Sequence, residues 1–256
     1  MISIRLKAQR HMLMAGFAFN LLLIVIFLIS EYLLLHGGLL FKELHLGLLI
    51  LLLFSLFTNM ALRNLYIKTS SLEVFFLFLF LLSLTLESLR GLAALPHSLN
   101  APLYIRNILS RSVYWGRVFG LLCLFTSSLY GVGLKYSNHS ALVITLLFIS
   151  LVLGSILPLD ITAIQGELLY KLGDRKGYMF LSYTLGLLLI INFLAAAFIR
   201  SSKRFLIIAL AGLLLLVGRE LVFLSLQPLF FLPGLVLLVL GILIFSRQIG
   251  LFYLWV

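Results

Sequence analysis

Charged residues are scarce in this sequence, and cysteine is almost absent. Asp, Glu, Lys and Arg together make up 11% of the 256 residues, whereas 63% are hydrophobic and the mean hydropathy is +1.21. Soluble domains are about 25% charged and about 45–50% apolar. A chain with so little polar surface cannot be kept in water, so lipid must be the solvent for most of it. The composition therefore predicts a multispanning integral membrane protein.

The residues needed for common catalytic and cofactor sites are missing or badly placed. The single cysteine, Cys123, excludes an intramolecular disulfide, an iron–sulfur cluster and a cysteine zinc site. No lysine lies in the middle of an apolar run, and the HExxH, Gly-x-Ser-x-Gly and P-loop motifs are absent. All five histidines lie at the ends of apolar runs or in loops, which disfavours haem ligation. We expect no cofactor, no metal site and no enzymatic activity.

The apolar runs predict an all-α bundle of eight transmembrane helices, because about 20 residues are needed to cross the hydrocarbon core. The runs lie at 12–35, 44–62, 73–95, 113–134, 140–159, 178–199, 205–226 and 229–246. Only Gln227 and Pro228 separate the last two, and Arg219 and Glu220 interrupt the seventh. A seven-span chain with a re-entrant tail is therefore the alternative, and it places the C-terminus on the opposite side of the membrane.

The connections are too short for a soluble domain, so residues 1–256 are predicted to form a single integral membrane domain. The connection before the sixth span has apolar residues at helical spacing, with Asp160 as a candidate N-cap and Gly173 as a stop. We expect an interfacial helix over about 161–172. Residues 101–112 are less regular and are also predicted to be interfacial.

The distribution of basic residues predicts a cytoplasmic N-terminus by the positive-inside rule. In the eight-span topology the inner set is Arg5, Lys7, Arg10, Arg63, Lys68, Lys135, Arg200, Lys203, Arg204 and Arg247. The outer set is Lys42, Arg106, Arg111, Lys171, Arg175 and Lys176. These residues are scattered at the edges of apolar runs, a pattern typical of topology rather than of nucleic-acid binding. We expect a cell inner or plasma membrane location. The first apolar stretch is too long for a cleaved signal peptide, so we expect it to remain as the first span.

A group of ionisable residues lies inside the predicted spans, where each costs about 2.5–3.5 kcal/mol at a helix centre. The group consists of Glu31, Glu87, Arg90, Arg117, Arg219 and Glu220. Alternating helix directions place all of them toward the outer side. Three acids and three bases make the group formally neutral, so it can close as ion pairs among the first, third, fourth and seventh spans.

Spacing suggests specific partners within this group. Glu87 and Arg90 are three residues apart and share a helix face. Arg219 and Glu220 are adjacent, so their side chains diverge by about 100° and need partners on other helices. The predicted crosses are Glu87 with Arg219 and Arg90 with Glu220.

Weaker features concern helix packing. Gly116 and Gly120 form a small-xxx-small pair that favours close helix approach, although such spacing is common by chance. Asn20, Asn59 and Asn192 are expected to form hydrogen bonds between helices. The run of phenylalanines over 75–80 is predicted to be lipid-facing and packing bulk.

Two interpretations of the intramembrane charges remain open at the level of sequence. They either hold the helices together, or they line an outward-facing polar pocket for a ligand, an ion or a proton. The pocket favours a sensory, signalling or partner-dependent membrane module, with the lipid bilayer around it and room for a protein partner at its cytoplasmic face. A secondary transporter or permease component is the alternative, and a structural subunit of a larger complex needs no pocket.

Overall fold

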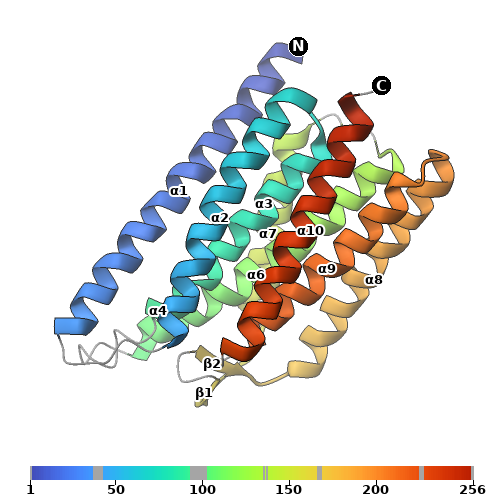
Figure 1. Cartoon of the computed structure of the whole chain (residues 1–256). Coiled ribbons are helices and arrows are strands. Elements are labelled where there is room, and N and C mark those ends of the chain that lie inside the picture. The colour runs from blue at the N-terminus through green and yellow to red at the C-terminus, as the bar shows by residue number, and fades with distance from the viewer. Residues whose placement is uncertain are drawn as a thin grey trace.

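The chain forms a bundle of long helices joined by short connections (Figure 1). The computed structural model describes residues 2–36, 43–92, 103–134, 136, 138–165, 169–224 and 228–254. Its first helices are α1 (Ile2–His36), α2 (Glu43–Thr69), α3 (Leu72–Glu87), α4 (Leu89–Leu92) and α6 (Leu103–Val132). These are followed by α7 (His139–Ile156), α8 (Arg175–Ile199), α9 (Arg204–Leu224) and α10 (Pro228–Leu254).

The prediction of an all-α membrane bundle with eight spans is confirmed. Within the described residues, eight helical segments are long and apolar enough to cross a bilayer, and α3 and α4 together form one of them. The last two spans, α9 and α10, are separate helices that pack along each other (Figure 1). An even number of crossings brings both chain ends to the same end of the bundle, as Figure 1 shows.

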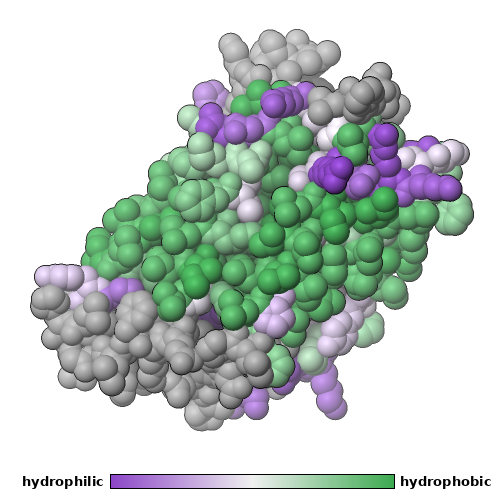
Figure 2. Space-filling view, viewed as in Figure 1, coloured by the Kyte–Doolittle hydropathy of each residue, from purple (hydrophilic) through white to green (hydrophobic). Residues whose placement is uncertain are grey.

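The third span lies at the centre of the bundle. In its most apolar window 83% of the residues are buried, against 22% in the fifth span. The phenylalanines over 75–80 are fully buried in this helix, so the predicted lipid exposure of that run is wrong. Phe76 stacks on Tyr130 of α6 with ring centroids 5.5 Å apart. Lipid-facing bulk comes instead from residues of the outer helices, which form the hydrophobic belt between two hydrophilic ends in Figure 2.

The connection before α8 is a β-hairpin, so the predicted interfacial helix over about 161–172 is wrong. Strands β1 (Leu159–Gln165) and β2 (Leu169–Leu172) pair in antiparallel fashion, with Leu159 opposite Leu172. Residues 161, 162 and 164 are β-branched, which favours extended backbone, and apolar spacing alone cannot distinguish a helix from a strand in so short a segment. The N-cap of the next helix is Asp174, which accepts a hydrogen bond from the Gly177 amide at 3.1 Å.

Helix α6 also differs from the prediction, because the segment expected to be interfacial is part of the span. The helix is continuous from Leu103 to Val132, and residues 101–102 lie outside the described part of the chain. The spanning segment has 29 residues, more than the roughly 20 needed for a perpendicular crossing, so α6 has enough length to cross at a tilt.

Glycines allow α6 to approach α3 closely. A Cβ atom at Gly116 would lie 2.7 Å from Leu86 Cβ, and one at Gly120 would lie 2.1 Å from Ser83 Oγ. Real Cβ contacts are essentially never this short, so only glycine fits at this distance between the helices. Arg117 lies between the two glycines in sequence and is thereby brought against the end of α3.

Candidate functional site: a buried arginine network and an adjoining pocket

The guanidinium of Arg117 is the centre of a buried polar network. Its Nε donates to the Tyr178 hydroxyl at 2.9 Å, Nη1 to Glu87 Oε1 at 3.4 Å and Nη2 to Glu220 Oε1 at 2.5 Å. The Phe223 ring covers its face, with the guanidinium carbon 3.6 Å from the ring centroid. Arg117 is fully buried and all of its side-chain nitrogens have partners. These contacts tie α6 to α3, α8 and α9.

Arg219 of α9 shares the Glu87 carboxylate with Arg117. Its Nε donates to Glu87 Oε1 at 3.2 Å, and its Nη2 donates to the backbone carbonyl of Arg117. The predicted pair of Glu87 with Arg219 is therefore present. One carboxylate oxygen serves two arginines, while Glu87 Oε2 is buried with no hydrogen-bond partner.

Arg90 takes a different partner from the two that were predicted. It forms an ion pair with neither Glu87 nor Glu220 among the described residues, and donates to the backbone carbonyls of Val222 at 3.2 Å and Phe223 at 3.0 Å. These carbonyls belong to the last turn of α9, and the final carbonyls of a helix commonly take partners from outside it. The helix is irregular at Ser88, between α3 and α4, where the Ser88 amide bonds to the Thr85 carbonyl at 3.2 Å in a tighter turn. Arg90 thus satisfies the C-terminal carbonyls of α9.

Glu31 is buried in α1, and the ion pairs of Arg117 and Arg219 are made with Glu87 and Glu220. These ion pairs therefore join two carboxylates to two guanidiniums, and neither Glu31 nor Arg90 takes part in them.

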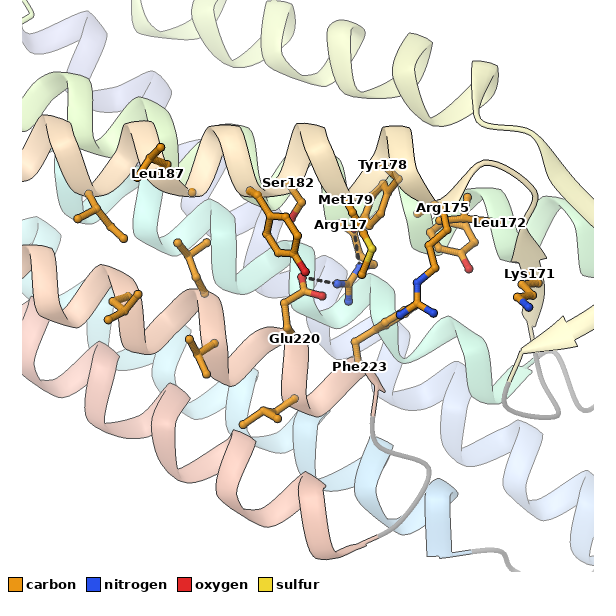
Figure 3. Close-up of a pocket in the computed structure, with 18 residues that line it drawn as sticks. Arg117, Lys171, Leu172, Arg175, Tyr178, Met179, Ser182, Leu187, Glu220 and Phe223 are labelled. Atoms are coloured by element: carbon orange, nitrogen blue, oxygen red, sulfur yellow. Dashed lines mark hydrogen bonds and ion pairs between the residues drawn. The ribbon is translucent and has the colours of Figure 1, made fainter.

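A cavity of about 440 Å³ lies between α8 and α9 and opens beside this network. Arg117, Glu220 and Tyr178 form its polar wall, and Lys171 and Arg175 stand at the end near the hairpin (Figure 3). The rest of the lining is largely apolar, and includes Gly186, Leu187, Ile190, Leu213, Leu216 and Val217. Glu220 has a side chain that is 34% exposed, so it belongs both to the buried network and to the cavity wall. The volume falls within the range of small-molecule sites, about 300–1,000 Å³.

Sequence reasoning missed Tyr178 and Phe223, because neither residue type signals a partnership with a distant arginine. It also missed Glu73, which lies at the boundary of the predicted third span. Glu73 is 1% exposed and accepts hydrogen bonds from the Ser71 hydroxyl and the Tyr253 hydroxyl, both at 2.8 Å. Ser71 is the N-cap of α3, and a carboxylate is favoured in the first turn of a helix. Glu73 therefore joins α3 to α10 at the end opposite the arginine network.

The membrane-embedded asparagines mainly support packing. Asn20 donates to Ser55 Oγ of α2 at 3.4 Å, and Asn192 of α8 donates to Ser128 Oγ of α6 at 3.0 Å. Both bonds join neighbouring helices, as predicted. Asn59 donates to Ser55 within its own helix at 3.3 Å.

Comparisons with known proteins add no functional assignment. No protein family, curated protein or solved structure shows a significant match to this chain. Within the described residues, no three His, Cys, Asp or Glu side chains gather in a group suited to a metal ion. The site must be interpreted from its own geometry.

Proposed function

We propose that this protein is a ligand-responsive sensory module of the membrane, in which an occupant of the cavity between α8 and α9 changes how the helices pack. The observation that supports this function is that Arg117 and Glu220 line the cavity and also form an ion pair of the buried network. An occupant of the cavity lies in direct contact with the groups that join α3, α6, α8 and α9.

The charge arrangement supports such coupling. Arg117 is fully buried, and removing one partner of a buried ion pair typically costs about 3–5 kcal/mol. Glu220 is partly exposed to the cavity, so an occupant can compete for it or for its arginine. A ligand shifts a conformational equilibrium only by its differential affinity for the two states. Contact with Arg117 and Glu220 gives an occupant a source of that differential affinity, because these two residues join helices whose packing would differ between the states.

Helix α9 offers a route from the cavity to the other end of the bundle. It reaches from Glu220 beside the cavity to Arg204 at the end where both chain termini lie (Figure 1). It packs closely on α10, since a Cβ atom at Gly218 would lie 2.8 Å from the Gly234 carbonyl oxygen. That end also has Lys203 and Arg200, and in the expected orientation it is cytoplasmic. A protein partner there would sense the position of α9 and α10.

The test uses a tryptophan as a permanent occupant of the cavity. Leu187 lines the cavity and the adjacent Leu188 does not, so Leu187→Trp and Leu188→Trp form a matched pair. Spin labels at Lys68→Cys and Lys203→Cys, both exposed positions, report the distance across the end of the bundle where the chain termini lie. The native Cys123 is replaced by serine in all variants. We expect Leu187→Trp to shift the distance distribution and Leu188→Trp to leave it unchanged.

Coupling through the ion pair is tested by adding Glu220→Gln. In that background we expect Leu187→Trp to lose its effect, because the ion pair between Arg117 and Glu220 that would carry the change is absent. Val217→Trp, from the α9 side of the cavity, provides a second occupant if Leu187→Trp is not monodisperse. Equal distance distributions for wild type and both cavity-filling variants would contradict the proposal.

Secondary transport is the second candidate, and the irregular turn between α3 and α4 favours it. The hydrogen-bond pattern of this span tightens at Ser88, directly after the buried Glu87, and ionisable groups beside an irregular part of a span are typical of transporter sites. In proteoliposomes, a proton-coupled transporter would show pH-driven flux that Glu87→Gln abolishes. A sensory module would show no such flux in either form.

A further inference from the structure

We propose that the occupant of this cavity is a single-chain anionic amphiphile, namely a long-chain carboxylate held by its head group at the hairpin end. This inference rests on the proposed function, because it names the ligand class of the same cavity. It follows from the charges at one end of the cavity, the apolar lining beyond them, and the length and volume available.

The charges of the lining favour an anion. Three basic side chains, those of Arg117, Lys171 and Arg175, face one acid, Glu220, which is already paired with Arg117 at 2.5 Å. Two further acids lie nearby but outside the lining. Asp174 caps α8, and Asp160 lies opposite Lys171 in the hairpin. Arg175 is therefore the lining base with the clearest role as a head-group ligand, and its planar guanidinium matches a carboxylate with two parallel hydrogen bonds.

The remainder of the cavity suits a hydrocarbon tail. Leu187, Ile190 and Leu213 line the part of the cavity away from the hairpin. The 15 residue-to-residue steps from Arg175 to Ile190 rise about 22 Å along α8 at about 1.5 Å per step. One leaflet of the hydrocarbon core is about 15 Å thick. A tail that starts at the basic end therefore lies along the cavity for the full depth of its leaflet, in the direction that Figure 3 shows from Arg175 to Leu187.

The volume favours one tail. A cavity of about 440 Å³ lies toward the lower end of the range for small-molecule sites, about 300–1,000 Å³. It therefore suits one hydrocarbon chain better than the two chains of a phospholipid. The tail gains little by leaving lipid for an equally apolar cavity. Selectivity must therefore come from the charged head group.

The experiment uses an oleate analogue with a photoreactive diazirine on its tail, added to the full chain in nanodiscs of zwitterionic phosphatidylcholine. We expect crosslinks on the cavity-facing residues of α8 and α9, with competition by oleate but not by oleyl alcohol. Lys171→Gln with Arg175→Gln should weaken oleate competition roughly tenfold or more, the ratio that corresponds to about 1.4 kcal/mol. Lys176→Gln is the matched control, because Lys176 is exposed beside Arg175 but does not line the cavity.

The outcomes separate this inference from the proposed function. Equal competition by oleyl alcohol, or full binding in the Lys171→Gln and Arg175→Gln variant, would overturn the anionic head group. Competition by phosphatidylglycerol as strong as that by oleate would contradict a ligand with a single chain. Crosslinks confined to other helices would contradict a binding site between α8 and α9. None of these results alters the spin-label distances of the Leu187→Trp variant, on which the proposed function depends.

Discussion

Arg117 and Glu220 connect the interior of the bundle to its cavity. The arginine has no exposed surface, yet its Nη2 lies 2.5 Å from a carboxylate oxygen of a side chain that is 34% exposed. The same arginine also contacts Glu87 and Tyr178, which lie on two other helices. A single buried arginine therefore joins a partly exposed carboxylate to the contacts among four helices.

Arg117→Gln should be strongly destabilising. The substitution leaves Glu220 without its arginine and removes one of the two cations that share Glu87. Loss of one partner from a buried ion pair costs about 3–5 kcal/mol, which we expect to appear as a large fall in the thermal unfolding midpoint in detergent. Arg111 lies on the same helix but is half-buried, so the unfolding midpoint of Arg111→Gln should fall much less. Similar midpoints for the two variants would show that the network does not stabilise the bundle.

Gly116→Ala should destabilise the packing of α3 against α6. The added Cβ would lie 2.7 Å from Leu86 Cβ, which cannot move without a backbone shift. Gly47→Ala is the control, because its Cβ would meet the Phe231 ring at an ordinary 3.4 Å. Alanine favours a helix over glycine by about 1 kcal/mol, so the control should be neutral or stabilised in a thermal unfolding assay. A stabilised Gly116→Ala would refute the close approach.

Tyr253→Phe should weaken the attachment of α10 to α3. The hydroxyl of Tyr253 donates to the buried Glu73 carboxylate, and leaving a buried polar group short of a partner costs about 1–3 kcal/mol. Tyr183→Phe removes an exposed hydroxyl and should leave the unfolding midpoint unchanged. Limited proteolysis provides a second measurement, because a weakened α10 should be cleaved faster near its C-terminal end. Equal midpoints and equal cleavage rates would contradict this role of Glu73.

The orientation of the bundle is a prediction from basic residues alone. With a cytoplasmic N-terminus, topology reporters fused after Ala101, Ser202 and Val256 should report outside, inside and inside. The eight spans place the last two positions on the same side as the N-terminus. A reporter after Val256 on the outside, with the one after Ser202 inside, would be incompatible with eight crossings.

The spans were predictable because long apolar runs in lipid must form helices that satisfy their own backbone hydrogen bonds. The pair of Glu87 with Arg219 was also within reach of sequence, since both charges lie near the same end of the third and seventh spans, which run in the same direction. The hairpin at 159–172 was not predictable, because its apolar spacing fits a helix as well as a strand.

The partners of Arg90 and Arg117 depend on details that a sequence does not encode locally. Arg90 bonds to carbonyls in the last turn of α9, and the position of that turn beside α4 is set by the packing of the bundle. Arg117 finds Tyr178 because glycines bring α6 close to α3 while α8 packs on the other side. The cavity also has no sequence signal, since it arises from the gap between two apolar helices.

The most direct test of the account is native mass spectrometry of the protein extracted from its membrane in mild detergent. Wild type, Leu187→Trp and Leu188→Trp are compared for bound molecules. We predict that wild type and Leu188→Trp retain a single-chain carboxylate and that Leu187→Trp loses it, because Leu187 lines the cavity and Leu188 does not. The same bound mass in all three proteins, or no bound carboxylate in wild type, would contradict the claim that the cavity between α8 and α9 is the ligand site.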